Sequence, residues 1–343
     1  MARTNNGAAL RVATDRRAAQ DAQGGAEAVA SAAALAWAGQ HEQAIAVATA
    51  ALAAAPDDRS ACRFDLLGLR ADSFIATGEL ARAAEDAATM RAIADRSDSS
   101  ALQARALNCQ SRVHSRGGDQ QAAIDSATAA LRAARRCRRK SPAAHSLVRL
   151  AEAQMRAHAY ESALENATAG ELAFESLGDA LHRGRAFWVA ACAHDGLDHA
   201  IDSDKAAEKA LALARQCGDR YGEACALNIR YRQHPDPATQ LRGLHQALAA
   251  FRAAGDRSGQ AAVYNNLSLS YGTLGLHRHA RRMMLLSLGF RRKAHDTWAR
   301  VNGSGILSLL ELRMGHTREA RRRLDESTLL NAPQPDRDRK SVV

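Results

Sequence analysis

A cassette of about forty residues recurs along most of this sequence. A glycine or a substitute, here called the register marker, identifies each copy. Five positions after it, all copies but one have a small residue. The register markers are Gly39, Gly78, Gly118, His158, Asp198, Pro235, Gly275 and Gly315, with steps of 39, 40, 40, 40, 37, 40 and 40. Repetition at such a period is typical of a solenoid, in which each unit buries its apolar face only against its neighbours. We therefore expect one elongated array in place of two separate domains.

Hydrophobic spacing within each copy predicts two helices joined by a turn. Residues 261–296 carry apolar side chains at helical spacing on both sides of Gly275, a residue type that suits a left-handed helix C-cap. At the seams between copies, Gly-Asp pairs at 178–179, 218–219 and 255–256 supply a C-cap followed by an N-cap. The predicted fold class is all-α, with about eight helix-turn-helix repeats over residues 25–330. The same pattern leaves residues 1–24 as a flexible N-terminal segment and residues 331–343 as a disordered C-terminal tail.

Composition supports the helical prediction and indicates a cytoplasmic protein. The chain is 46% hydrophobic but only 4% aromatic, and it contains six prolines. Alanine, the best helix former, dominates the apolar residues, whereas proline is the worst. No stretch approaches the roughly 18 apolar residues of a membrane span, and the N-terminus lacks the apolar core of a signal peptide. The six cysteines form no Cys-x-x-Cys pair, which indicates buried thiols in a reducing compartment.

The order of aromatic or leucine, small residue, glycine and alanine in each copy resembles the tetratricopeptide repeat (TPR) family. The motif stands as Tyr264, Leu267, Ser268, Tyr271, Gly275 and Ala280 in the seventh copy, and as Gly118, Ala123 and Ala130-Leu131 in the third. The likeness covers roughly residues 25–330, although the usual TPR period is 34 residues. It implies a right-handed α-solenoid, the TPR-like superhelix. HEAT-like and armadillo-like stacks have similar periods and are the alternative architectures.

The resemblance also implies where binding residues lie, because the first helix of each TPR unit lines a concave groove. Carried onto this sequence, the groove positions include Arg105, Asn108, Arg112, Arg116, Arg149, Arg156, Arg185, Trp188, Arg232 and Asn265. Such a groove would suit an acidic or carboxylate-ended peptide through charge-assisted hydrogen bonds, with Trp188 as an apolar contact. The implied function is a non-catalytic, regulatory protein-interaction scaffold. The competing interpretation is that these are ordinary exposed side chains in an arginine-rich protein, and the family's Lys and Asn carboxylate clamp is not reproduced.

Motifs for catalysis, cofactors and metals are not found. No lysine follows a glycine, which excludes a phosphate-binding P-loop, and His41-Glu42 has Ile45 where the zinc motif H-E-x-x-H needs its second histidine. His277 and His279 are the best metal candidates, but residues two apart on a helix point to different faces. We therefore expect no catalytic residue, no cofactor and no metal ligand.

Two other functions compete with the protein-interaction scaffold. The net charge is +10, and residues 132–140 form a basic run that could bind nucleic acid or simply cover an exposed helix end. Aromatic residues are not interleaved with this run, which argues against nucleic acid. The later copies resemble the regulatory arrays ahead of bacterial adenylate/guanylate cyclase, diguanylate cyclase and transcription-activator domains. The chain would then be the sensory portion of such a protein. The expected partner is a protein or peptide, with no membrane association.

Overall fold

The computed structural model describes residues 23–54, 61–293 and 297–331, and all regular structure within these ranges is α-helix. The predicted N-terminal segment 1–24 and tail 331–343 lie outside the described residues, except that residues 23, 24 and 331 are helical. None of the described helices is long and apolar enough to cross a membrane.

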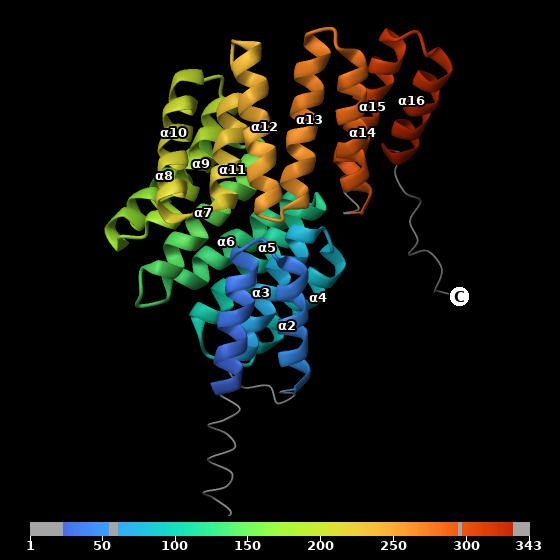
Figure 1. The fold of residues 1–343 in the computed structure, drawn as a ribbon. Helices are drawn as coiled ribbons and strands as arrows, with labels where there is room; N and C mark the ends of the chain where they lie inside the picture. The colour runs from blue at the N-terminus through green and yellow to red at the C-terminus, as the bar shows by residue number, and fades with distance from the viewer. Residues whose placement is uncertain (1–22, 55–60, 294–296, 332–343) are drawn as a thin grey trace, which may run out of the picture.

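The described helices form eight consecutive antiparallel pairs, which stack side by side into a curved array (Figure 1). The pairs are residues 23–37 with α2 (His41–Ala54), α3 (Ala61–Thr77) with α4 (Leu80–Asp95), α5 (Ser100–Gly117) with α6 (Gln120–Arg135), α7 (Ser141–Arg156) with α8 (Tyr160–Leu177), α9 (Ala180–Gly196) with α10 (Ala200–Cys217), α11 (Arg220–Tyr231) with α12 (Pro237–Ala253), α13 (Arg257–Thr273) with α14 (His277–Lys293), and α15 (Thr297–Arg313) with α16 (Thr317–Asn331). The prediction of an all-α solenoid of about eight helix-turn-helix repeats is confirmed.

The register markers form the turn between the two helices of each pair. Seven of the eight have positive φ, including the two that are not glycine, His158 at 62° and Asp198 at 59°. The eighth, Pro235, cannot adopt this conformation because its ring holds φ near −65°. Its turn is built differently: α11 is only 12 residues long, and the Asp236 side chain caps α12 by accepting a hydrogen bond from the Thr239 amide at 2.8 Å.

Small residues fill the space between paired helices. Ala44, Ala83, Ala123, Ala163 and Ala280, each five residues after a register marker, are all buried. Serine joins the two helices of some pairs: Ser111 on the first helix donates to Ala123 O on the second at 2.8 Å, and Ser268 and Ser308 make the equivalent bonds in the last two pairs. In the fifth pair the direction is reversed, because Ser203 on the second helix donates to Ala191 O on the first at 3.0 Å. The alanine-rich composition thus gives close helix packing instead of a broad aromatic core.

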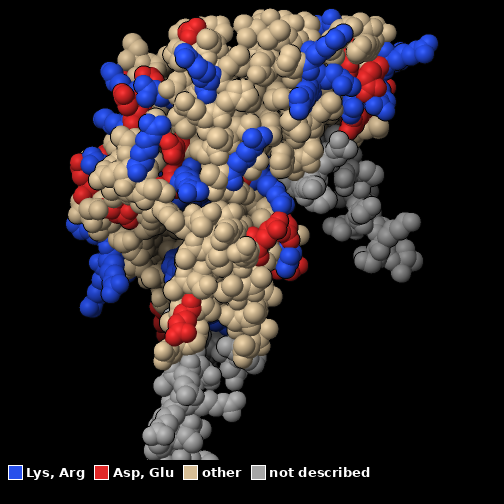
Figure 2. Space-filling model, viewed as in Figure 1, with Lys and Arg blue, Asp and Glu red and all other residues tan. Residues whose placement is uncertain are grey.

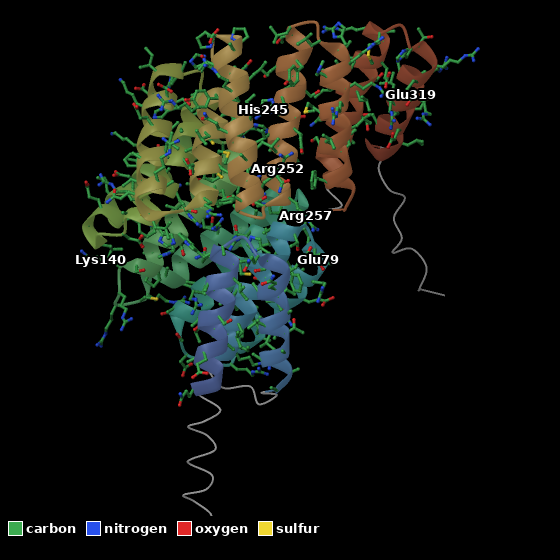
Figure 3. All side chains as sticks on the ribbon, viewed as in Figure 1. Glu79, Lys140, His245, Arg252, Arg257 and Glu319 are labelled. Carbon is green, nitrogen blue, oxygen red and sulfur yellow. The ribbon has the colours of Figure 1, made fainter. Side chains whose placement is uncertain are left out.

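The array curves until its first turn contacts the seam between the sixth and seventh pairs (Figure 1). His41 donates from Nε2 to the Ala254 carbonyl at 3.0 Å, and Arg257 pairs with Glu42 at 2.8 Å. Arg257 is labelled at the lower end of α13 in Figure 3. The backbones meet so closely that a Cβ placed on Gly39 would stand 2.3 Å from the Ala253 carbonyl oxygen. These contacts, called here the closure, convert the open groove of a solenoid into a partly enclosed space.

Candidate ligand-binding cavity

The closure borders a partly open cavity of about 850 Å3. Its walls come mainly from the first helices of pairs one to six, with His41, Met90 and Phe174 from second helices and Ala254 and Asp256 from a seam. Ligand-binding cavities commonly measure about 300–1,000 Å3. Seven of the ten residues that the sequence placed on the binding face line this cavity: Arg105, Asn108, Arg112, Arg116, Arg149, Arg185 and Trp188.

The other three predicted residues lie away from the cavity lining. Arg156 turns back along α7, with its Nε 3.6 Å from Glu152, and Arg232 pairs with Asp195. Asn265 is half-buried on α13, past the closure. The site is therefore built from the third, fourth and fifth pairs, with contributions from the pairs that flank them.

Acidic side chains that the sequence interpretation overlooked pair with the cavity arginines. Arg105 binds Asp65 at 2.6 Å, Arg112 pairs with Asp72, and Arg185 lies 3.3 Å from Asp219. In the ion pairs Asp65–Arg105 and Asp72–Arg112 the acid precedes the arginine by forty residues, one period of the repeat. Reading the sequence across adjacent copies, and not only within one copy, would have found these partners. The lining is consequently mixed in charge, with arginines held in defined positions by their acids.

Positive charge is nevertheless in excess around Glu152, in the fourth pair. Burial alone would raise the pKa of this carboxyl, but Arg149, Arg156, Arg116 and Arg112 outweigh burial and lower its pKa to about 2. Arg149 donates directly to Glu152, while burial and the nearby Arg112 lower the pKa of Arg149 itself. These five side chains are called here the Glu152 cluster. Arg112 also pairs with Asp72, and Arg116 lies 4.0 Å from Asp256, so the four guanidinium groups face three carboxylates in all. The net positive charge that remains favours a further anionic group.

Arg116 differs from the other cavity arginines because it ties the cavity to the closure. Its guanidinium donates to Ser258 Oγ at 2.7 Å and to the Tyr221 hydroxyl at 3.1 Å, and it lies 4.0 Å from Asp256. Burial opposes its charge, but Tyr221 and Asp256 outweigh burial and raise its pKa. Because three elements meet at this side chain, its first role is structural.

The thiols in the cavity wall are poorly suited to nucleophilic chemistry. Burial raises the pKa of Cys109 to about 12, and it also raises the pKa of Cys225. A thiol with such a pKa remains protonated at neutral pH, whereas the thiolate is the nucleophile. The nearby amide of Asn108 donates to Ser146 Oγ at 3.0 Å. The cavity therefore presents hydrogen-bonding and charged groups without an activated cysteine among them.

The basic run at residues 132–140 lies outside the cavity, at the end of α6 and in the turn that follows. Its arginines at 135, 136, 138 and 139 are exposed, and Lys140 projects at the outer edge of the array (Figure 3). On the face shown in Figure 2, basic side chains are interleaved with acidic ones. His277 and His279 on α14 are also remote from the cavity lining.

Comparison with known proteins supports the architecture. No family model matches the sequence, and no curated protein matches it. Among solved structures, a Rap protein complexed with competence and sporulation factor is 13% identical, with a TM-score of 0.61 over 90% of this chain and 98% of that chain. The chain is a TPR-like α-solenoid. Two other structures share the fold. Aspartyl phosphate phosphatase F from Bacillus subtilis is 10% identical, with a TM-score of 0.57 over 91% of this chain and 95% of that chain. The APC/C hetero-tetramer Cut9-Hcn1 is 14% identical, with a TM-score of 0.60 over 89% of this chain and 52% of that chain.

Proposed function

We propose that this TPR-like solenoid is a non-catalytic scaffold that binds a peptide, or an extended segment of a partner protein, inside the partly open cavity. Support comes from the size of the cavity and from its lining by the first helices of six pairs. The Rap protein that resembles this chain along nearly its whole length was crystallised with competence and sporulation factor, which favours ligand binding by the same kind of array. The proposed location is the cytoplasm, because all six cysteines are free thiols.

The Glu152 cluster is the observation that carries the proposal. A carboxylate of the ligand would accept hydrogen bonds from Arg112 and Arg149, each of which keeps donors beyond those used by its internal acid. Hydrogen bonds between two charged groups are roughly twice as strong as neutral ones, and enclosure reduces their screening by water. Trp188 lines the same cavity and packs against the buried cluster of Ala151, Ala167 and Val189, so it offers an apolar surface beside the charges. The proposed ligand is therefore an acidic peptide.

A binding role fits the chemistry of the wall better than catalysis. The charged groups are ion-paired, and the cavity thiols Cys109 and Cys225 are held in their protonated form by burial. Paired, preorganised charges recognise a ligand at low entropic cost, because they need not be ordered when it arrives. We propose no nucleic-acid function for the basic run, since it lies outside the cavity.

The test uses a fluorescein-labelled library of five-residue peptides rich in Asp and Glu, measured by fluorescence anisotropy against the purified chain. We expect Arg149→Gln and Arg112→Gln each to weaken the selected peptides at least tenfold, as loss of one charge-assisted hydrogen bond predicts. Arg215→Gln is the matched control, because Arg215 also pairs with a glutamate but lies outside the cavity, and it should leave binding unchanged. Equal binding of Asn/Gln versions of the peptides, or equal affinities for all three variants, would contradict the proposal.

A further inference from the structure

Two histidines and one aspartate meet in the cavity wall, where the fourth and fifth pairs join. His145 comes from α7, His182 from the first turn of α9, and Asp179 is the N-cap of α9. One ligand atom from each side chain lies within 4.8 Å of the other two, and the two imidazole centroids are 4.3 Å apart. Both histidines line the cavity. The sequence interpretation chose none of these residues, because they come from different copies of the repeat.

The hydrogen bonds leave metal-binding lone pairs available. His145 Nδ1 lies 2.8 Å from the Ser141 carbonyl oxygen, which can only accept, so Nδ1 carries the proton and Nε2 is free. A backbone carbonyl on the second ring nitrogen is the usual support for a histidine ligand. His182 Nδ1 lies 2.8 Å from Asp179 Oδ2. That separation is a hydrogen bond in the metal-free protein, and it is also short enough for both atoms to share one ion with bonds of about 2.0–2.2 Å.

Charge and surroundings also suit a cation. Burial, His145 and Arg185 lower the pKa of His182, and hydrogen bonds from His182 lower the pKa of Asp179 in spite of burial. The cation of Arg185 is itself offset by Asp219 at 3.3 Å. Phe174 packs edge-on against His145 and stacks with His182 on the inner side, which restrains both rings.

We propose that His145, His182 and Asp179 bind one divalent transition-metal ion, such as Zn2+ or Co2+, in the wall of the cavity. Two neutral imidazoles and one carboxylate form a nitrogen-rich set that favours these ions over Mg2+ and Ca2+, which prefer oxygen ligands. Three protein ligands leave a fourth position on the ion. Two of the three ligands, His145 and His182, line the cavity. The ion would add positive charge to a wall that already contains the cavity arginines. The metal site stands independently of the peptide proposal.

Titration of the metal-free full chain with Co2+ tests the site, because tetrahedral Co2+ absorbs in the visible range. We expect one equivalent to bind, competed by Zn2+, without the near-ultraviolet charge-transfer band that a cysteine thiolate would add. His145→Gln and His182→Gln should each weaken binding at least a hundredfold. His245→Gln is the matched control, since His245 is an exposed histidine on α12, and it should bind as the natural chain does.

Asp179→Asn keeps the test decisive if a histidine variant loses helix content by circular dichroism. Asparagine caps a helix as well as aspartate does but removes the charge, so the fold should persist while Co2+ affinity falls at least tenfold. Full affinity in Asp179→Asn, unchanged binding in both histidine variants, a thiolate band, or no uptake at one equivalent would each overturn the metal site.

Discussion

The first six helix pairs and the last two build different surfaces from the same hairpin. The residue six positions before the register marker is Arg112 in the third pair and Glu152 in the fourth, and both are ion-paired in the cavity wall. At the same position the seventh and eighth pairs carry Leu269 and Leu309, which are 46% and 49% exposed. In the third and fourth pairs this position is therefore charged and lines the cavity, whereas in the seventh and eighth pairs it is apolar and about half exposed.

The difference follows the extent of the cavity. The charged side chains of pairs three to five meet opposite charges on the same helix or on an adjacent pair. Helices α14 to α16 extend beyond the closure (Figure 1). Of the twelve large hydrophobic side chains that are exposed among the described residues, eight fall between Leu269 and Leu329. Contiguous exposed apolar surface commonly marks an interaction site.

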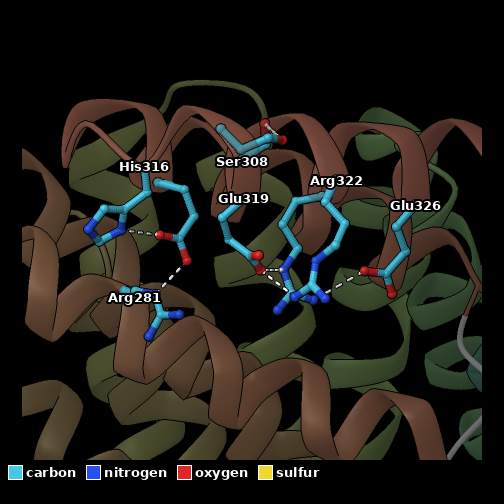
Figure 4. Close-up of polar contacts among 9 residues, drawn as sticks. Arg281, Ser308, His316, Glu319, Arg322 and Glu326 are labelled. Carbon is cyan, nitrogen blue, oxygen red and sulfur yellow. Dashed lines mark hydrogen bonds and ion pairs between the residues drawn. The ribbon is translucent and has the colours of Figure 1, made fainter.

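The two regions also use buried carboxylates differently. Glu311 on α15 is fully buried, and it accepts hydrogen bonds from Arg281 at 2.5 Å and His316 at 2.8 Å (Figure 4). This local network joins α14, α15 and the turn before α16. Glu152 instead gathers arginines at the centre of the cavity. The terminal pair is therefore held by its immediate neighbours, as expected for the end of a solenoid.

The largest expected effect tests whether the enclosed charges support the closed region. Glu152→Gln removes the carboxylate that lowers the mutual repulsion of four arginines, and we expect a loss of about 3 kcal/mol in the free energy of unfolding at pH 7. Because the pKa of Glu152 is lowered to about 2 from an ordinary value near 4.5, its stabilising contribution is present above about pH 4.5. That contribution is lost as the pH falls toward 2. Urea unfolding from pH 7 to pH 3 should show the two proteins converging.

Glu223→Gln is the matched control for this prediction. Glu223 also binds an arginine, Arg215, at 2.8 Å, but both side chains are substantially exposed. An exposed ion pair contributes about 0–1 kcal/mol, so this variant should stay close to the natural chain at every pH. If Glu152→Gln cost no more than Glu223→Gln, the enclosed charges would not be what distinguishes the closed region.

Some features of the fold and site follow from local sequence, and others do not. The register markers predict the turns because positive φ is a property of single residues. Seven predicted groove residues line the cavity because the position of a residue within the repeat sets the direction in which its side chain points. The closure could not be predicted in this way. It brings His41 to Ala254, 213 residues apart, and the curvature that does so is the sum of small rotations at every seam. The contact between His145 and His182 depends only on the seam between the fourth and fifth pairs, so comparison of adjacent copies could have found it.

A second, smaller effect tests the closure through its glycines. Gly39 and Gly275 both have positive φ, at +77° and +73°, so alanine costs roughly 1 kcal/mol at either site. A Cβ at Gly39 would also stand 2.3 Å from the Ala253 carbonyl oxygen, whereas nothing lies within 4 Å of one at Gly275. We therefore expect Gly39→Ala to lower the free energy of unfolding by about 2 kcal/mol. It should also separate the first turn from the seam between the sixth and seventh pairs.

Hydrogen exchange of the amides at residues 253–258, measured by mass spectrometry, reports the separation directly. Exchange there should accelerate in Gly39→Ala and remain unchanged in Gly275→Ala, which keeps the same backbone penalty outside the closure. Equal destabilisation by the two variants, with unchanged exchange at this seam, would mean that the contact between the first turn and the sixth pair contributes nothing to stability.

The smallest expected effect concerns the open region. Leu309→Ser and Leu269→Ser replace side chains that are about half exposed, and each should change the free energy of unfolding by less than about 0.5 kcal/mol in urea. A loss above about 2 kcal/mol would show that these leucines are packed in solution, and the contrast with Arg112 and Glu152 would fail. A small loss would mean that folding does not require leucine at these positions. Their apolar character would then have to be explained by contacts that the isolated chain does not make, which is the property expected of a docking surface rather than a core.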